Sequence, residues 1–217
     1  MSQPREAIAK VFDLALVPML EPRYNIAPTQ QVPTVLRSPE QSEERQFQML
    51  RWGLIPFWAK DPAMGARLIN ARAETAAEKP SFRAAFRHRR CLVVADGFYE
   101  WQRQEGKKQP FYFRLQDGQP FGFAGLWERW EAPDGETIES CTILTTEANE
   151  ILRPIHDRMP VILAPKDYDL WLDPSVQKAE PLQQLLRPYL AKAMTSYAVS
   201  TKVNNPANNS PDCINSL

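Results

Sequence analysis

Apolar residues recur along the chain with two different periods. In residues 4–14 they follow the period of a helix, which places Ile8, Val11 and Phe12 on one face. From residue 91 onward they gather in short β-rich segments, separated by turn signals such as Asp117-Gly118. The pattern predicts helices over 4–14, 79–88, 166–172 and 181–190, and strands near 32–36, 47–54, 91–101, 109–115, 122–128, 141–146, 159–164 and 197–203.

The order of these elements favours an α+β fold. Helices are interspersed with strands that read as antiparallel, and the strand–helix–strand alternation of a parallel sheet is missing. The chain has 217 residues, of which 43% are hydrophobic, so we expect one domain over residues 1–217 with a sizeable core. Its 20 prolines outnumber its eight glycines, which predicts long irregular connections held by prolines.

Charge and hydropathy narrow the possible partners and locations. The net charge is zero, but residues 51–90 carry nine Lys/Arg against three Asp/Glu, and residues 128–150 carry seven Asp/Glu against one Arg. We expect the basic excess of residues 51–90, with Arg23 and Arg158, to form a single basic groove that binds DNA phosphates. No apolar run approaches the length of about 20 residues that spans a bilayer. The first ten residues lack the apolar segment of a signal peptide. We therefore expect a cytoplasmic protein without a membrane partner.

The cysteines give no sign of a disulfide framework or a metal site. Cys91, Cys141 and Cys213 lie far apart, and none forms a CxxC or Cys/His pair with metal-ligand spacing. We expect three reduced thiols, with Cys91 in the core at the start of a strand. The sequence predicts no metal and no cofactor.

The segment ADGFYEW, residues 95–101, places a carboxylate among aromatic side chains. A glutamate in such an apolar run is unusual, because buried charges are rare unless paired. Strand alternation puts Phe98 and Glu100 on one face, and Tyr99 and Trp101 on the other. One face can then build the core while Glu100 faces a pocket. Partial desolvation there would raise its pKa and suit it to proton transfer.

Three further polar segments accompany it. They are RYNIAPTQ (23–30), LINARAET (68–75) and PIHDRMPV (154–161), the last of which holds one of only two histidines. A Glu, a His, an Asn and an Arg in rigid local frames are the parts of a general acid/base site. What these segments lack is an obvious nucleophile.

Each candidate residue also has a purely structural interpretation. Asn70 can cap a turn, Arg72 can pair with Glu74 or Glu100, Glu100 can face solvent at a strand edge, and His156 can lie at the surface beside Asp157. Trp52, Phe57 and Trp58 can stack on bases or belong to the core. Taken singly, the structural interpretation is favoured for the four polar residues, and the two interpretations of the aromatic residues are evenly balanced. Taken together, the polar segments favour a site.

Long motifs occur in a characteristic order along the chain. They are RYNIAPTQ, RWGLIPFWAKD, LINARAETAAEKPSFR, RRCLVVADGFYEWQ, KKQPFYF, AGLWE, CTILTTEAN, IHDRMPVIL and VSTKVNNPANN. In this order they resemble the SOS response-associated peptidase family, the SRAP domain. The resemblance implies a strongly curved, partly barrel-like, mainly antiparallel sheet surrounded by helices.

The resemblance also implies a function. SRAP proteins recognise abasic sites in single-stranded DNA, notably near junctions with duplex. They crosslink through an N-terminal cysteine exposed by self-processing: its amine forms a Schiff base with the sugar aldehyde, and its thiol closes a thiazolidine. We expect a monomer that associates with the nucleoid when bound to DNA. The roles carried over are catalysis by Asn70, Glu100 and His156, phosphate contacts by Arg23, Arg72 and Arg158, and lining of the site by Pro28 and Trp101, beside Trp52 and Trp58.

The N-terminus departs from the family pattern. The family begins Met-Cys-Gly-Arg, whereas this chain begins Met1-Ser2-Gln3-Pro4. The resemblance places about seven residues, each spanning at most about 3.3–3.6 Å, between the family's nucleophile and this stretch. We therefore expect the amino end to lie outside the pocket. We also expect this chain to bind abasic single-stranded DNA without forming a thiazolidine.

Three functional hypotheses remain open at this point. The first is an SRAP protein whose covalent chemistry depends on an N-terminal cysteine. The second is a module that binds single strands or junctions without chemistry. The third is a thiol hydrolase that uses Cys91 and His156 as its nucleophile and base.

Overall fold

The centre of the molecule is a closed ring of five strands. The computed structural model describes residues 1–38, 42–104 and 106–217. Hydrogen bonding runs from β7 through β4, β1, β2 and β8 and back to β7, which closes a barrel. The β2–β8 pair is parallel and the other four are antiparallel, so the barrel is mixed. The barrel strands are β1 (Gln31–Ser38), β2 (Ser42–Trp52), β4 (Arg90–Ala95), β7 (Phe121–Glu131) and β8 (Thr137–Glu147).

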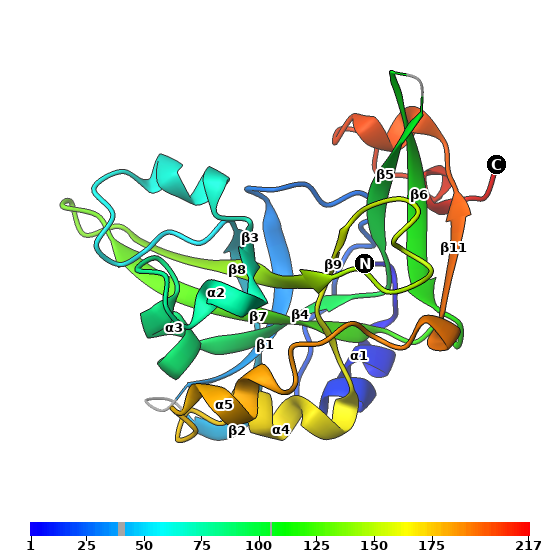
Figure 1. The fold of residues 1–217 in the computed structure, drawn as a ribbon. Coiled ribbons are helices and arrows are strands. Elements are labelled where there is room, and N and C mark those ends of the chain that lie inside the picture. The colour runs from blue at the N-terminus through cyan, green and yellow to red at the C-terminus, as the bar shows by residue number, and fades with distance from the viewer. Residues whose placement is uncertain (39–41, 105) are drawn as a thin grey trace.

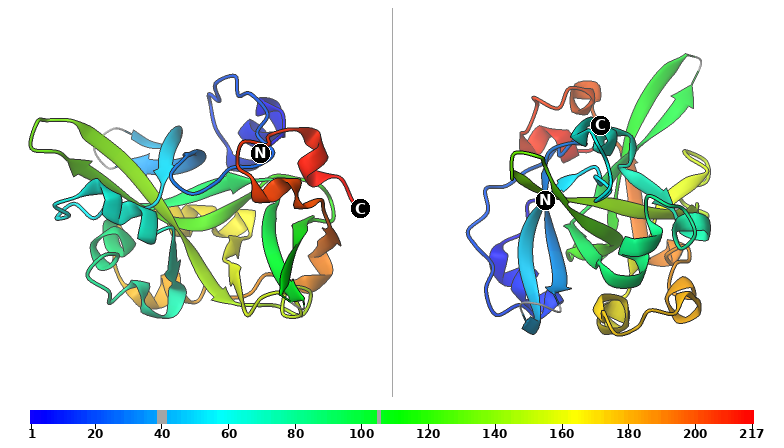
Figure 2. Two further views of the ribbon diagram at one scale, coloured as in Figure 1. Left: turned by 90° about the horizontal axis from the view of Figure 1, so that it is seen from above. Right: turned by 90° about the vertical axis from the view of Figure 1, so that its left-hand side faces the viewer.

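Short strands and a second sheet extend this barrel (Figure 1). The additional strands are β3 (Asn70–Arg72) and β9 (Arg158–Pro160) on β8, and β10 (Ile162–Leu163) on β7. The second sheet has the order β11-β6-β5 and contains β5 (Phe98–Gln104), β6 (Lys107–Leu115) and β11 (Met194–Ala198). Figure 2 shows the β7–β8 hairpin reaching out at one end of the molecule and the second sheet standing at the other.

Short helices cover the outside of the barrel. The α-helices are α1 (Arg5–Phe12), α2 (Ala73–Ala76), α3 (Arg83–His88), α4 (Tyr168–Leu172) and α5 (Ala179–Gln183). The 3-10 turns are η1 (Pro62–Arg67), η2 (Pro165–Asp167), η3 (Ala191–Ala193), η4 (Thr201–Asn204) and η5 (Pro211–Ile214). No helix within the described ranges is long and apolar enough to cross a bilayer.

Strand β4 shows how the sequence builds two hydrophobic clusters. All six of its residues are buried. Leu92 and Val94 pack with α1, α3 and α4, whereas Cys91 and Val93 belong to a cluster that includes β6. Because alternate side chains of a strand point to opposite faces, a continuous apolar run places this strand between two layers. This position fixes the turn that follows it, Asp96-Gly97, at the centre of the molecule.

The expected α+β class and curved, barrel-like sheet are confirmed, and so is the antiparallel β1–β2 pair. Several boundary predictions are wrong. The helix expected over 79–88 is α3, which begins only at Arg83. The strand expected over 91–101 is two strands, β4 in the barrel and β5 in the second sheet, separated by the turn at Asp96-Gly97. The helix expected over 181–190 is α5, which begins at Ala179 and ends at Gln183; Pro188 lacks the N–H that a longer helix would need there. The strand expected over 197–203 ends at Ala198, because the Ser200 hydroxyl accepts the N–H of Lys202 and starts η4.

Candidate functional site

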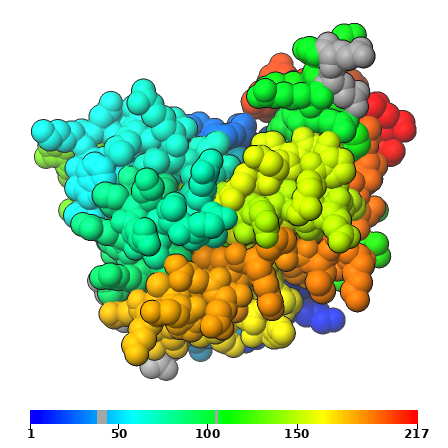
Figure 3. All heavy atoms as spheres, viewed as in Figure 1, coloured from blue at the N-terminus to red at the C-terminus, as the bar shows by residue number. Residues whose placement is uncertain are grey.

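A cavity of about 440 Å³ lies between the barrel and the second sheet. Its wall includes the β4–β5 turn, the loop before β1, the end of β2, the start of β3 and the segment after β11. Figure 3 shows the surface hollowed between the cyan segment that precedes β3 and the green β5–β6 hairpin. Of the residues predicted from sequence, the lining contains Pro28, Trp52, Asn70, Glu100 and Trp101.

Glu100 lies on β5 and faces this cavity, as the alternation predicts. Its neighbour Phe98 packs into one cluster, whereas Tyr99 and Trp101 pack into another. Burial raises the pKa of the Glu100 carboxyl to about 7; the charge of His156 acts in the opposite direction and that of Asp157 in the same direction. A carboxyl with this pKa can both donate and accept a proton near neutral pH.

His156 is outside the lining but close enough for its charge to act on Glu100. Its Nδ1 lies 3.1 Å from the backbone nitrogen of Arg158 and 3.4 Å from the Asp157 carboxylate. The same Nδ1 lies 3.1 Å from the Arg158 carbonyl oxygen, so it can accept from the Arg158 N–H or donate to its carbonyl, according to the tautomer. The loop therefore places an imidazole beside a carboxylate and within electrostatic reach of Glu100.

Asn70 comes to the cavity through β3, which runs parallel to β8 with Asn70 opposite Ile143. The preceding residue is held by Trp52, whose indole nitrogen donates to the Ile69 carbonyl at 2.9 Å. The Asn70 amide is exposed at the cavity wall and can donate to or accept from a ligand. The structure thus brings Asn70 and Glu100 to one cavity from two different sheets.

The predicted phosphate-binding arginines are placed differently. Arg158 donates to the Glu74 carboxylate at 2.8 and 2.9 Å, and Arg23 donates to the Gln30 side chain and the Gln31 carbonyl. Arg72 is exposed on β3. All three lie outside the cavity lining, so any phosphate contact would be made at its margin.

The single basic groove expected from residues 51–90 is only partly formed. Arg90 is buried and donates to the backbone carbonyls of Phe86, Arg87 and Trp171, which are carbonyls at or near helix ends that lack helical partners. Arg89 pairs with Glu128. These two arginines stabilise the fold and are not free for DNA, so the charge count overstates the basic surface.

The tryptophans predicted to contact DNA differ in their position relative to the cavity. Trp52 and Trp101 are half-buried and line the cavity. Trp58 lies outside it with 46% of its surface exposed, next to the exposed Phe57. An indole in either place presents a face on which a base can stack.

The amino end of the chain lies in the cavity, which corrects the expectation that it would lie outside. The amino group of Met1 is 3.3 Å from the buried carboxylate of Asp96. Asp96 also accepts the backbone N–H of Ser2 at 2.6 Å and its hydroxyl at 2.8 Å. Helix α1 begins at Arg5 and stays intact. The expectation failed because it counted residues along the chain without knowing that Asp96 holds residues 1 and 2 against the wall.

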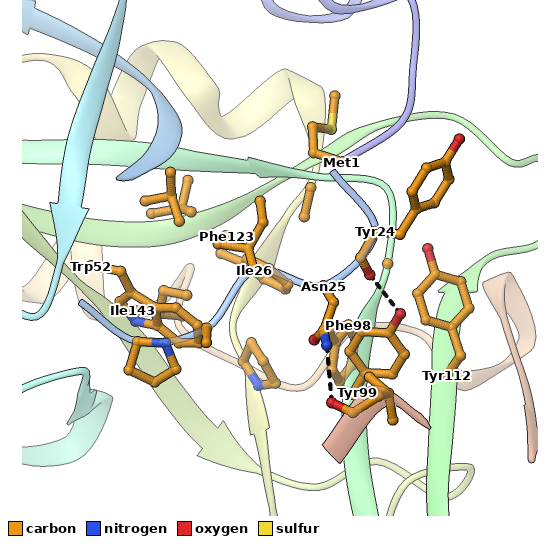
Figure 4. A pocket seen from close by; sticks show the side chains of 18 of the residues that line it. Met1, Tyr24, Asn25, Ile26, Trp52, Phe98, Tyr99, Tyr112, Phe123 and Ile143 are labelled. Atoms are coloured by element: carbon orange, nitrogen blue, oxygen red, sulfur yellow. Dashed lines mark hydrogen bonds between the residues drawn. The ribbon is translucent and has the colours of Figure 1, made fainter. Parts of the chain in front are cut away.

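The segment after β11 forms the opposite wall, which the sequence did not assign to the site. Asn25 is buried and its amide nitrogen lies 3.0–3.1 Å from the carbonyls of Val203, Asn205 and Asn208. The Trp101 indole donates to Asn204 at 2.7 Å. Figure 4 shows Asn25 and Tyr99 joined to their partners beside the cavity. The motifs RYNIAPTQ and VSTKVNNPANN were the only signal for this contact.

Replacing Asn25 with leucine should loosen this wall. The change keeps the size of the side chain but removes the two N–H groups that the Asn25 amide shares among these three carbonyls, which should lower the free energy of unfolding by about 1–3 kcal/mol. Urea denaturation measures the loss. Asn215→Leu, at an exposed position of the same segment, should stay within about 0.5 kcal/mol of wild type. Equal stabilities of the two variants would contradict the role given to Asn25.

The cysteines do not provide a nucleophile. All three are free and buried, and Cys91 has none of its surface exposed. Burial raises the pKa of its thiol well above the usual value, which disfavours the reactive thiolate. The thiol hydrolase hypothesis is therefore not supported, and the core position expected for Cys91 is confirmed.

Comparison with known proteins identifies the family of this chain. The family model "SOS response associated peptidase (SRAP)" matches residues 1–206. The chain is 47% identical over 196 residues to "Abasic site processing protein YoqW" of Bacillus subtilis (strain 168), covering 90% of this chain and 86% of that one. It is 37% identical over 222 residues to "Abasic site processing protein HMCES" of Xenopus tropicalis, covering 89% and 66%.

A solved structure has the same architecture. A protein from Bacteroides thetaiotaomicron, determined by X-ray crystallography, superposes with a TM-score of 0.82 at 30% identity, covering 100% of this chain and 91% of that one. The family match spans the barrel, the second sheet and the cavity between them. The chain belongs to the SOS response associated peptidase (SRAP) family.

Proposed function

We propose that the cavity binds an abasic site in single-stranded DNA and, given an N-terminal cysteine, crosslinks to it. The observation that carries the proposal is a cavity in which Glu100, with a pKa near 7, lies with Asn70 and with the amino end of the chain. The volume of about 440 Å³ is within the range of small-ligand sites. The relatives named as abasic site processing proteins support it.

The proposed chemistry needs proton transfers that these residues can supply. A cysteine amine adds to the sugar aldehyde, the adduct loses water to give an imine, and the thiol adds to the imine carbon to close a thiazolidine. Glu100 gives a proton to the departing hydroxyl. Glu100 or His156 takes the proton of the thiol as sulfur adds to the imine carbon, and a proton is returned to the imine nitrogen, which becomes the ring amine. Asn70 orients the sugar, since proximity is lost when a reacting group is misplaced. The same groups would serve self-processing at an initiator methionine.

DNA binding can be tested without any chemistry. Fluorescence anisotropy should show tighter binding to an abasic single strand, or to one beside a duplex junction, than to an intact strand. The logarithm of affinity should fall against the logarithm of salt concentration with a slope of about −1.4, if Arg23 and Arg72 each contact one phosphate while Arg158 stays paired with Glu74.

A matched pair of variants locates the contacts. Arg72→Ala should make the slope less steep by about 0.7, whereas Lys178→Ala, which removes one charge from the exposed residue before α5, should leave it unchanged. A flat salt dependence, or equal affinity for intact and abasic strands, would refute the proposed binding mode.

Crosslinking to the abasic site is tested with a variant that carries an added N-terminal cysteine. In the extended chain, Met-Cys-Gly-Arg and three linking residues precede Met1. Denaturing gel electrophoresis with abasic single-stranded DNA distinguishes a crosslinking protein from a module that only binds. Binding without a heat-stable adduct from the extended chain, after confirmed removal of its first methionine, would favour the non-covalent alternative.

A further inference from the structure

The ion pair between Arg158 and Glu74 joins the two segments that carry Asn70 and His156. Arg158 lies at the start of β9, and Glu74 lies in α2, two residues after Arg72. Both terminal nitrogens of Arg158 reach the carboxylate, at 2.8 and 2.9 Å, and one of them also donates to the Thr145 carbonyl at 2.5 Å. The carboxylate thus occupies the fork of the guanidinium.

This fork is the same shape that arginine presents to phosphate. Guanidinium groups bind carboxylates and phosphates through two parallel N–H···O bonds, so the two anions compete for one set of donors. The hydrogen bond from Arg158 lowers the pKa of Glu74 below its usual value, so Glu74 is charged at neutral pH. An incoming phosphate must therefore displace a charged carboxylate.

The Arg158–Glu74 ion pair lies near the surface, where a DNA phosphate can displace the carboxylate from the guanidinium. The Glu74 side chain is 52% exposed and that of Arg158 is 23% exposed. Exposed ion pairs contribute little to stability and are open to competing ions. The bond from Arg158 to the Thr145 carbonyl can hold the guanidinium in place while its carboxylate partner leaves.

We propose that Glu74 acts as an internal competitor for DNA phosphate at Arg158 and so limits the affinity of the protein for single strands of any kind. The proposal rests on the proposed DNA-binding function. Phosphate contacts are common to intact and abasic strands, so Glu74 changes affinity for both and leaves their ratio unchanged. Its consequence is faster release from undamaged DNA.

The test is Glu74→Gln, which removes the competing charge and keeps the side chain's size. Affinity for both intact and abasic single strands should rise about three- to tenfold at low salt. The salt slope should steepen by about 0.7, the value for one added phosphate contact on a single strand. Glu78→Gln, an equal change of charge at an exposed position nearby, should leave the slope unchanged, and Glu74→Asp should restore wild-type behaviour.

A double-variant cycle isolates the pair. In an Arg158→Met background, Glu74→Gln should bring no gain in affinity, with thermal unfolding confirming that each variant is folded. A gain that persists without Arg158, or a Glu74→Gln variant with unchanged or weaker binding, would overturn the competitor role and leave the proposed function standing. Failure of the wild-type protein to bind single strands would overturn both.

Discussion

In the extended chain, Glu100→Gln should slow crosslinking to abasic single-stranded DNA by about 10²–10⁴-fold, the usual contribution of a general acid/base group. Glutamine fills the same space and keeps hydrogen-bonding capacity, but it cannot exchange a proton. The rate of adduct formation on denaturing gels measures the effect. Glu150→Gln, at an exposed position outside the cavity lining, should crosslink at the wild-type rate.

The same substitution should stabilise the protein at alkaline pH. Burial raises the pKa of Glu100 to about 7 from its usual 4.5, so between these values the folded state retains a proton that the unfolded state has lost. Stability from this group therefore falls as pH rises from about 4.5 to about 7. Glu100→Gln should remove that loss and raise the melting temperature at pH 8.

Glu100→Gln is thus expected to lower the crosslinking rate but to raise the melting temperature at pH 8, and this combination separates a catalytic effect from a loss of folding. A slow but more stable variant cannot be explained by unfolding. If the Glu100→Gln/His156→Ala double variant folds and crosslinks at the wild-type rate, the acid/base assignment is wrong. If Glu100→Gln alone is instead less stable than wild type at pH 8, burial does not destabilise the charged form of Glu100, and the reason given for its raised pKa is wrong.

The second large effect is the appearance of a heat-stable adduct when an N-terminal cysteine is supplied. The chain as given should bind abasic DNA and form no thiazolidine, because the Ser2 hydroxyl is far less acidic than a thiol of pKa about 8.5. The extended chain should form the adduct. Once the first methionine is removed, six added residues precede Met1; they reach at most about 22 Å, and they start from a residue that already lies in the cavity.

The controls separate the thiol from the added length. An extended chain carrying serine in place of the added cysteine should bind DNA equally well and give no heat-stable adduct. A stable adduct from that serine version, or from the chain as given, would refute the thiazolidine mechanism. Mass spectrometry of each protein establishes which residue carries the amino terminus.

Local patterns in the sequence were enough to place Glu100. Its face of β5 follows from two-residue alternation alone, and the apolar run before it reads as a strand buried on both sides. The closure of the barrel could not be predicted from the sequence, because it depends on the parallel pairing of β2 with β8, and several other strands lie between these two in the chain. Hydrophobic periodicity indicates that a strand exists without saying which strand lies beside it.

The residues missed were those whose role depends on contacts between distant segments. Asp96 stands in the segment that drew attention to Glu100, yet nothing local shows that it binds Ser2. Arg158 carries a positive charge, but its pairing with Glu74 shows only in three dimensions. The excess of Lys/Arg in residues 51–90 predicted a basic groove, but Arg90 is buried and does not contribute its charge to the surface.

The wall held by Asn25 has a consequence for how the protein acquires activity. Asn25 contacts carbonyls 178 and 183 residues further along the chain. Contacts between residues far apart in the sequence require closure of a long loop, and folding is slower where such contacts dominate. Partly folded chains would thus lack a finished cavity, even with the barrel in place. On refolding from urea, the recovery of abasic-DNA binding should coincide with the slowest kinetic phase, so ligand binding reports completion of the native state.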